Sequence, residues 1–385
     1  MRILFLITTI GHGKGGHFHS LNTIANELGK CHDVKILNIG IKQSSVFEEG
    51  NYSIQFLKYN GFNFLSVLTR LKVFSLQFDP DAIHSFDVES FAFGRLISKK
   101  MNFPTILNKC GGPNPKKYYP KADKQVLFSL ENYTYYQNNK RYRKSKLAFI
   151  PNRVKEVKID KNRVNLFYEK YGRAEFSILR ISRIGKHYHS SILQSINLLE
   201  NMLEQGKNAR LILIGTIQSE QIYKEIQKYI QIKNLKPYVI IETNDIFTNK
   251  ASELLELGEI IVGTGRNFME AASLNKILLV PQKDDRFPLL VIGDNFQEIF
   301  KTNFSPRTVV TNFDSGKNLK NILSLTNKNE KKNSQLWFKK YFDVETGVKL
   351  YLDLYNHDLP AKNNSLNIID STLNSIYSIK SLLRK

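Results

Sequence analysis

The chain has 385 residues, of which 42% are hydrophobic and 24% charged, so its composition excludes a disordered or a fibrous protein. Its length favours two domains, each large enough to bury a core of its own. The 56 Lys and Arg against 35 Asp and Glu leave a net charge of +21, which indicates an anionic partner: nucleic acid, an acidic membrane surface or a phosphorylated substrate.

Two features bear on where the protein works. The two cysteines, Cys31 and Cys110, exclude a disulfide scaffold and a Cys-rich zinc site, and they fit a reducing compartment. The apolar run at residues 3–10 resembles a short secretory signal, but it leads into glycines instead of a cleavage site, so we interpret it as a buried strand. Because no apolar run reaches the roughly 20 residues of a membrane span, the sequence predicts a cytoplasmic protein with peripheral contact to the inner face of the cell membrane.

Short apolar runs alternate with stretches of helical period along most of the chain. The expected strands are residues 3–10, 34–39, 82–84, 105–107, 147–150, 178–181, 211–214, 238–241, 260–262 and 277–280. Continuous apolar strands that alternate with amphipathic helices are typical of parallel sheets covered on both faces. Because the series restarts near Phe176, we predict an α/β protein of two Rossmann-like domains facing a central cleft, with ligands at the carboxyl ends of the strands.

The expected division of the chain is an N-terminal domain at residues 1–160, a C-terminal domain at 161–356 and a helical tail at 357–385. In the tail, Leu366, Ile369, Leu373 and Ile376 follow helical spacing. We expect this helix to pack on the body of the protein. The alternative is a helix that lies on a membrane surface, although the segment carries few cations before its last residues.

A glycine loop follows the first expected strand. Residues 11–16 satisfy G-x-G-x-x-G between a strand and a helix, and such glycines let the backbone approach a phosphate. The acidic residue that should hold a ribose at the end of the second strand is missing, because Asn38 stands there, and no Gly-Lys-Ser/Thr follows for a P-loop. Nicotinamide or flavin binding is therefore disfavoured. Gly15 and Gly16 remain candidates for phosphate contact, with a tight structural turn as the alternative.

The second half of the chain carries a sharper motif. Residues 259–281, EIIVGTGRNFMEAASLNKILLVP, read as a strand, a glycine loop, a helix and a second strand. This segment resembles the donor-binding segment of GT-B glycosyltransferases of the family-4 type (glycosyl transferases group 1). The resemblance implies that Glu270 binds the ribose hydroxyls of a sugar nucleotide, and that the amides of Gly263, Thr264 and Gly265 contact its sugar and phosphates. A carboxylate accepts two hydrogen bonds from a vicinal diol, and a loop that opens a helix offers amides to an anion.

Further motifs match the same family in the same order over roughly residues 1–300. They are Gly15-Gly16, His32-Asp33-Val34, Pro80-Asp81-Ala82-Ile83-His84, Pro151-Asn152-Arg153-Val154, Ile181-Ser182-Arg183-Ile184 and Leu211-Ile212-Leu213-Ile214-Gly215. In the fifth motif, the resemblance implies that Arg183 grips the diphosphate.

The chain also departs from the family pattern. Val262 stands where the family has the first glutamate of its Glu-x7-Glu pair, which puts the identity of the donor sugar in doubt. Tyr188 stands where the family has a lysine, and Lys186 is the nearest substitute. Arg266 replaces an apolar residue beside the glycine loop, where it suits either a bidentate phosphate contact or a solvated ion pair.

The resemblance implies transfer of a sugar from a nucleotide diphospho-sugar to a hydroxyl, with retention of configuration, no obligatory metal and no other cofactor. No Asp-x-Asp is placed to hold a divalent ion to the diphosphate. A general base cannot be chosen among His17, His84 and Asp87, and a role for His84 in the core is favoured over a catalytic one. With Lys109, these residues are the acceptor-side candidates. The alternatives are a sugar-nucleotide epimerase, a non-catalytic nucleotide-sugar-binding protein and a nucleic-acid-binding module, which lacks any recognition motif.

The positive charge is unevenly distributed. Residues 109–161 hold 14 Lys and Arg against 4 Asp and Glu, and tyrosines such as Tyr118, Tyr119, Tyr133, Tyr135, Tyr136 and Tyr142 are interspersed. Such a stretch can stack bases, lie at a bilayer interface or form a solvated basic face. We interpret it as contact with an anionic membrane that carries a lipid-linked saccharide acceptor for capsule or lipopolysaccharide synthesis, and we expect no nucleic acid.

Overall fold

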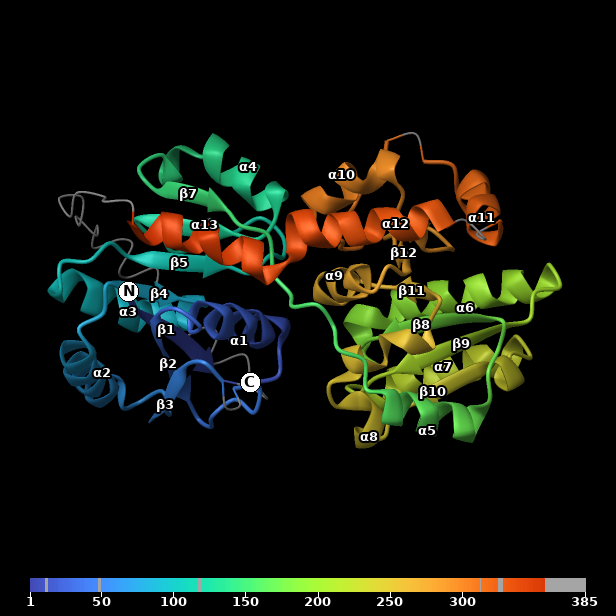
Figure 1. Cartoon of the computed structure of the whole chain (residues 1–385), viewed down its shortest axis with the longest axis horizontal. Coiled ribbons are helices and arrows are strands. Elements are labelled where there is room, and N and C mark those ends of the chain that lie inside the picture. Colours follow the sequence, from blue (N-terminus) through green and yellow to red (C-terminus); the bar gives the residue numbers. More distant parts are fainter. Residues whose placement is uncertain (11–12, 48–49, 117–118, 312, 325–327, 357–385) are drawn as a thin grey trace. The chain divides into compact units, whose positions relative to one another are not determined.

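The computed structural model describes residues 1–10, 13–47, 50–116, 119–311, 313–324 and 328–356. These residues form two compact α/β units (Figure 1). Unit 1 comprises Met1–Arg153 together with the helix α13 (Val344–Asn356), and unit 2 comprises Val154–Asp343. The predicted tail at residues 357–385 lies outside the described residues. Within the described residues, no helix is both long and apolar enough to cross a bilayer.

Unit 1 is built on a parallel sheet with the strand order β3-β2-β1-β4-β5-β6-β7. Its strands are β1 (Arg2–Thr9), β2 (Asp33–Gly40), β3 (Ser53–Lys58), β4 (Ala82–Ser85), β5 (Ile106–Lys109), β6 (Lys124–Leu127) and β7 (Lys146–Phe149). Its other helices are α1 (Gly16–Leu28), α2 (Phe64–Phe78), α3 (Val88–Lys100) and α4 (Leu130–Asn138).

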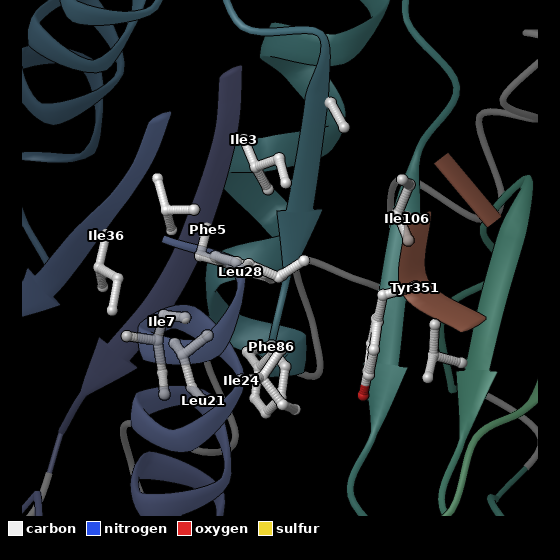
Figure 2. Close-up of a cluster of buried hydrophobic side chains, with 14 of the residues drawn as sticks. Ile3, Phe5, Ile7, Leu21, Ile24, Leu28, Ile36, Phe86, Ile106 and Tyr351 are labelled. Carbon is white, nitrogen blue, oxygen red and sulfur yellow. The ribbon is translucent and has the colours of Figure 1, made fainter. Parts of the chain in front are cut away.

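The alternation of side chains along β1 explains why both faces of this sheet are covered. Ile3, Phe5 and Ile7 point into one apolar core, which includes α1 and α13 (Figure 2). Leu4 and Leu6 point into a second core with α2 and α3. Successive residues of a strand face opposite sides, so the unbroken apolar run produces a strand that is buried on both faces, as predicted.

The division of the chain differs from the one we expected. Unit 1 ends at Arg153 and takes back α13, which the sequence analysis placed in the second domain. The physical reason is apolar burial, because Tyr351, Leu354 and Tyr355 are buried in the core of unit 1. The carbonyl at the end of α13 is also satisfied there: the Lys124 ammonium, itself buried on β6, donates to the Leu354 oxygen at 2.7 Å.

Unit 2 is built on a sheet with the strand order β10-β9-β8-β11-β12-β13, parallel except for the last pair. Its strands are β8 (Phe176–Ile181), β9 (Ala209–Ile214), β10 (Val239–Glu242), β11 (Ile260–Val262), β12 (Ile277–Val280) and β13 (Leu289–Leu290). Its α-helices are α5 (Lys161–Tyr171), α6 (His189–Glu204), α7 (Glu220–Ile232), α8 (Asp245–Thr248), α9 (Arg266–Ser273), α10 (Gly293–Lys301), α11 (Ser315–Leu323) and α12 (Lys328–Trp337). Two parallel, Rossmann-like sheets therefore confirm the predicted fold class.

Candidate functional site

The strand order of unit 2 brings two loops together. The chain runs outward from β8 through β9 to β10, and it then returns to place β11 on the other side of β8. Ligands of open α/β sheets bind at such a reversal, outside the carboxyl ends of the two strands. Arg183 and Lys186 follow β8, while residues 263–266 and Glu270 follow β11. The topology therefore places the donor-side residues singled out in the sequence at one edge of one sheet.

The glycine loop after β11 is closely packed. The Gly263 amide donates to the Leu279 carbonyl at 2.8 Å, and a Cβ on Gly263 would lie 2.9 Å from the Cα of Phe268. Gly265 has a φ of +50°, which disfavours other residues, and it is followed directly by α9. Glycine is thus required at both positions, so that the backbone itself forms the surface between Thr264 and the start of the helix.

Arg266 and Glu270 form an ion pair one turn apart on α9. The Arg266 Nε donates to the Glu270 Oε1 at 2.7 Å, and the Glu270 side chain is only 12% exposed. Burial raises the pKa of Glu270, and the adjacent guanidinium opposes that rise. Of the two roles considered for Arg266, the structure contains the ion pair, although it is part-buried and not freely solvated.

The loop after β8 presents exposed cations. Arg183 and Lys186 are both exposed. The Arg183 Nη2 donates to the hydroxyl of Tyr188 at 3.0 Å, and its guanidinium lies 5.4 Å from the centre of that ring. Tyr188, which replaces the lysine of the family pattern, therefore positions the neighbouring arginine.

Arg180 is a residue of this site that the sequence analysis missed. It lies on β8 and is 1% exposed. Its Nη1 donates to the carbonyl of Val262 at 2.8 Å, and its Nη2 donates to the Ser191 hydroxyl at 3.0 Å. Burial lowers the pKa of Arg180 to about 10, so the guanidinium stays charged at neutral pH. The one available signal was a single cation inside an otherwise apolar strand.

The corresponding edge of unit 1 lies where β1 and β4 adjoin, since β1 separates β2 from β4. Gly15 and Gly16 follow β1 and open α1, with Gly16 exposed. Gly11 and His12 lie outside the described residues. Gly13 has a φ of +67°, and its carbonyl accepts a hydrogen bond from Ser44. Asn38 stands where the dinucleotide pattern has a ribose-binding acid. Its side-chain amide donates to the Thr9 hydroxyl, and its side-chain oxygen accepts from the Ser44 backbone amide.

His17 follows the two glycines and packs against Phe18, with the ring centroids 4.3 Å apart. Burial lowers the pKa of His17, and the charge of Glu89 opposes that shift. Glu89 belongs to the first turn of α3, so this acid and the imidazole come close enough to interact. No motif in the sequence pairs these two residues.

The other three acceptor-side candidates serve the fold. His84 is fully buried on β4, its Nδ1 lies 2.9 Å from the Tyr355 hydroxyl, and burial lowers its pKa to about 3. Asp87 caps α3 and accepts from the Ser90 and Thr8 amides, each at 2.6 Å. The ammonium of Lys109 donates to the Gly111 carbonyl at 2.6 Å. None of these groups is presented as a free base or a free cation.

The described tyrosines of the basic stretch at residues 109–161 are buried or half-buried. Tyr136 and Tyr142 are buried and stack with their ring centroids 4.0 Å apart, in a cluster that also includes Tyr119, Tyr133 and Tyr135. Tyr118 lies outside the described residues. Tyr136 and Tyr142 are therefore not available for stacking bases or for entering a bilayer, whereas Tyr119, Tyr133 and Tyr135 are half-buried.

Acidic and metal-ligating side chains show no arrangement typical of a metal centre within the described residues, since no three His, Cys, Asp or Glu side chains gather there. Asp79-Pro80-Asp81 has the Asp-x-Asp spacing, but it precedes β4 and lies away from the carboxyl ends. Asp79 pairs with the Arg2 guanidinium at 2.7 Å, and Asp81 accepts from the Arg2 amide at 2.7 Å.

This protein is similar to known proteins in its structure and not detectably in its sequence. No family model and no curated protein matches the sequence. A glycosyltransferase from Rickettsia africae is 12% identical, with 94% of this chain and 100% of that chain covered and a TM-score of 0.65. Anabaena HepE in complex with UDP is 16% identical, with 92% and 99% covered and a TM-score of 0.65. This chain has the GT-B fold, as the resemblance predicted.

A UDP-GlcNAc 2-epimerase from Methanocaldococcus jannaschii is also similar, at 12% identity, with 93% of this chain and 100% of that chain covered and a TM-score of 0.54. At such identities the GT-B fold is what the structures share, and the architecture alone does not separate a transferase from an epimerase. The function must be argued from the site.

Proposed function

We propose that this protein is a glycosyltransferase that moves a sugar from a nucleotide diphospho-sugar to a hydroxyl acceptor. The observation that carries the proposal is the convergence at the β8–β11 edge of unit 2. Exposed Arg183 and Lys186 follow one strand, and a tightly packed glycine loop with Glu270 follows the other. HepE, which has the same fold, is complexed with UDP, so uridine nucleotides are the first donors to test.

The chemistry follows from the charge that develops on the leaving group. When the sugar–phosphate bond breaks, negative charge accumulates on the diphosphate. Arg183, Lys186 and the amides of residues 263–265 would stabilise that charge where it forms. Glu270, kept in place by Arg266, would accept hydrogen bonds from the ribose hydroxyls. We further propose that the reaction is a retaining hexosyl transfer without an obligatory metal, because these cations can neutralise the diphosphate themselves.

The donor side is tested by thermal unfolding and calorimetry against nucleoside diphosphates and nucleotide sugars. A bound nucleotide at about 100 times its Kd should stabilise the fold by about 2.7 kcal/mol. Glu270→Ala should abolish most of this shift. Glu200→Ala is a matched control, because Glu200 on α6 is 15% exposed and is paired with Lys233 and Arg286. The proposal fails if no nucleotide shifts the melting temperature, or if Glu270→Ala binds as the parent does.

The epimerase alternative is separated by the products. A transferase releases nucleoside diphosphate in proportion to the acceptor supplied, whereas an epimerase converts the nucleotide sugar without any acceptor. Chromatography of a nucleotide sugar incubated with the enzyme, with and without saccharide acceptors, distinguishes the two. Acceptor-independent conversion to a second sugar would overturn the transferase proposal.

We propose that the acceptor is a lipid-linked saccharide of cell-surface polysaccharide synthesis, and that the enzyme meets it on an anionic membrane. Because Tyr136 and Tyr142 are buried, a different surface offers the stronger support for this proposal. Phe62 is 97% exposed and Leu65 is 75% exposed, and Val73 and Leu76 are exposed on the same face of α2. Helix α2 contains no acidic residue. The Lys72 ammonium lies against Lys100 and lowers the pKa of that lysine, so two cations adjoin the apolar face and suit anionic headgroups.

Sedimentation with vesicles tests this surface. The full chain should bind phosphatidylglycerol vesicles and not phosphatidylcholine vesicles, and high salt should weaken binding. The double variant Leu65→Gln/Leu76→Gln should lose most of the binding, whereas Leu166→Gln, at an exposed leucine of α5, should not. Binding that is unchanged in the double variant would refute the surface. The surface would also be refuted as a membrane contact if the parent chain bound no vesicles and formed a dimer that the double variant converts to a monomer.

A further inference from the structure

Arg180 is a buried residue that hydrogen-bonds to the chain beside both loops of the proposed donor site. It lies on β8, three residues before Arg183, and its guanidinium donates to the carbonyl of Val262, the last residue of β11 before Gly263. Its second donor, Nη2, contacts Ser191 in the first turn of α6, and the Ser191 hydroxyl in turn donates to the Tyr188 carbonyl. One side chain therefore fixes the end of β11 and the start of α6 relative to β8.

The charge of Arg180 has no matching acid. Three other arginines of unit 2 are paired with acids: Arg163 with Asp160 and Glu253, Arg266 with Glu270, and Arg286 with Glu200. Within the described residues, Arg180 hydrogen-bonds to a carbonyl and a hydroxyl and lies over the Tyr188 ring, and its Nε has no hydrogen-bond partner. Burying a charge without a counter-ion carries a desolvation cost that an apolar side chain of similar volume would not carry. Packing alone therefore gives no reason for an arginine here.

We propose that Arg180 is a positioning residue for the diphosphate of the donor. It holds the two anion-binding loops in register through Val262 and Ser191, and its positive charge is balanced when the diphosphate binds above it. This inference rests on the proposed function and deepens it. Charge acts strongly across a low-dielectric interior, so a buried cation beneath the loops favours a dianion over them. The residue that Arg180 contacts is also one at which this chain differs from the family pattern. Val262 stands where the family has the first glutamate of its Glu-x7-Glu pair, and Arg180 binds its carbonyl.

A structural role and a positioning role predict different results. If Arg180 only braces the fold, its loss lowers the melting temperature and leaves ligand affinity unchanged while the protein is folded. If it positions the diphosphate, its loss weakens binding of a nucleoside diphosphate but not of the matching nucleoside, which has no phosphate. The affinity ratio between these two ligands is the decisive readout.

The experiment uses Arg180→Met and Arg180→Gln, the second of which removes the charge and retains an N–H donor on a shorter side chain. Calorimetry with UDP and uridine should show a loss of UDP affinity of tenfold or more, with uridine affinity unchanged. Arg180→Lys should recover part of the UDP affinity. Arg210→Met is the matched control, because Arg210 on β9 also donates to two backbone carbonyls, those of Tyr171 and Gly172.

The outcomes separate this inference from the proposed function. If the parent protein binds neither UDP nor any other nucleoside diphosphate, the proposed function fails. If the parent binds UDP and Arg180→Gln binds it equally well, or loses uridine and UDP affinity to the same extent, the positioning role is refuted while the proposed function stands. If Arg180→Met does not fold, Arg180→Gln and Arg180→Lys still give the comparison.

Discussion

The carboxyl-end edges of the two sheets have the same topology and use their polar residues differently. In unit 1 the reversal lies between β1 and β4, and in unit 2 it lies between β8 and β11. At the first edge, His84, Asp87 and Lys109 are engaged by Tyr355, by backbone amides and by the Gly111 carbonyl. At the second edge, Arg183 and Lys186 are exposed, and Arg183 is held by the Tyr188 hydroxyl and ring. Exposure thus distinguishes Arg183 and Lys186 from the polar residues of the first edge.

The largest effect expected from this contrast is an acid sensitivity caused by His84. Burial lowers its pKa to about 3 in the folded state, whereas the unfolded chain takes up the proton near pH 6.5. The folded state therefore loses stability as the pH falls from about 6.5 towards 3, by about 1.4 kcal/mol for each pH unit and about 5 kcal/mol at most.

Denaturant unfolding of the parent and of His84→Gln between pH 7.5 and 4.5 measures this slope. The difference between the two proteins should grow in favour of the variant as the pH falls, and nucleotide binding at pH 7.5 should be equal. A variant with the parent's full acid dependence would show that burial does not lower the pKa of His84. Reduced nucleotide affinity would place it in the binding site.

A smaller effect is expected at the edge of unit 2. Arg183→Ala should remove a charged hydrogen bond to the diphosphate, worth about 1.5–3 kcal/mol, or about 10- to 150-fold in nucleotide affinity. Because Arg183 is exposed, the free energy of unfolding without ligand should change little. Calorimetry with UDP measures the affinity, and Lys228→Ala on α7, another exposed cation, is the control. Equal losses in both variants would mean that net charge, and not this loop, attracts the nucleotide.

The smallest effect is expected at Asp87. Asp87→Ala should destabilise unit 1 by about 1–2 kcal/mol, because it removes the cap of α3 and leaves the Thr8 amide without its acceptor. Asp87→Asn keeps an acceptor oxygen and should retain part of that stability. Thermal unfolding measures both. If turnover falls in Asp87→Ala and in Asp87→Asn alike while stability is kept, Asp87 is a catalytic residue and the contrast between the two edges breaks down.

Much of this fold was readable from the sequence because its strands are buried on both faces. The ten expected runs correspond to β1, β2, β4, β5 and β7–β12. β6 was missed because Lys124 and Gln125 are polar and yet buried. The edge strand β3 was missed because it alternates between exposed and half-buried residues. Lys124 is buried because it donates to the carbonyl of Leu354 in α13, which lies 230 residues further along the chain. Hydrophobic periodicity cannot detect such a contact.

The donor-side residues follow from a motif whose spacing fixes them relative to a strand end, so their convergence at one edge was predictable. Their contacts were not. The pairing of Arg266 with Glu270 and the bond between Arg180 and the Val262 carbonyl depend on side-chain orientation. The tyrosines of residues 109–161 show the same limit, since an aromatic residue next to lysines reads alike in sequence whether it faces a core or the solvent.

The return of α13 to unit 1 has a consequence for the order in which the protein is made. Residues 1–153 emerge from the ribosome well before Val344–Asn356. The sheet of unit 1 therefore lacks its last helix until unit 2 has been synthesised. Until then Phe86, Ile106 and the other side chains that pack around Tyr351 are uncovered (Figure 2). Domains generally fold in the order of synthesis, and incomplete ones aggregate. Here the first domain to emerge is the last to be completed, so a nascent chain arrested before Val344 should need chaperones to stay in solution.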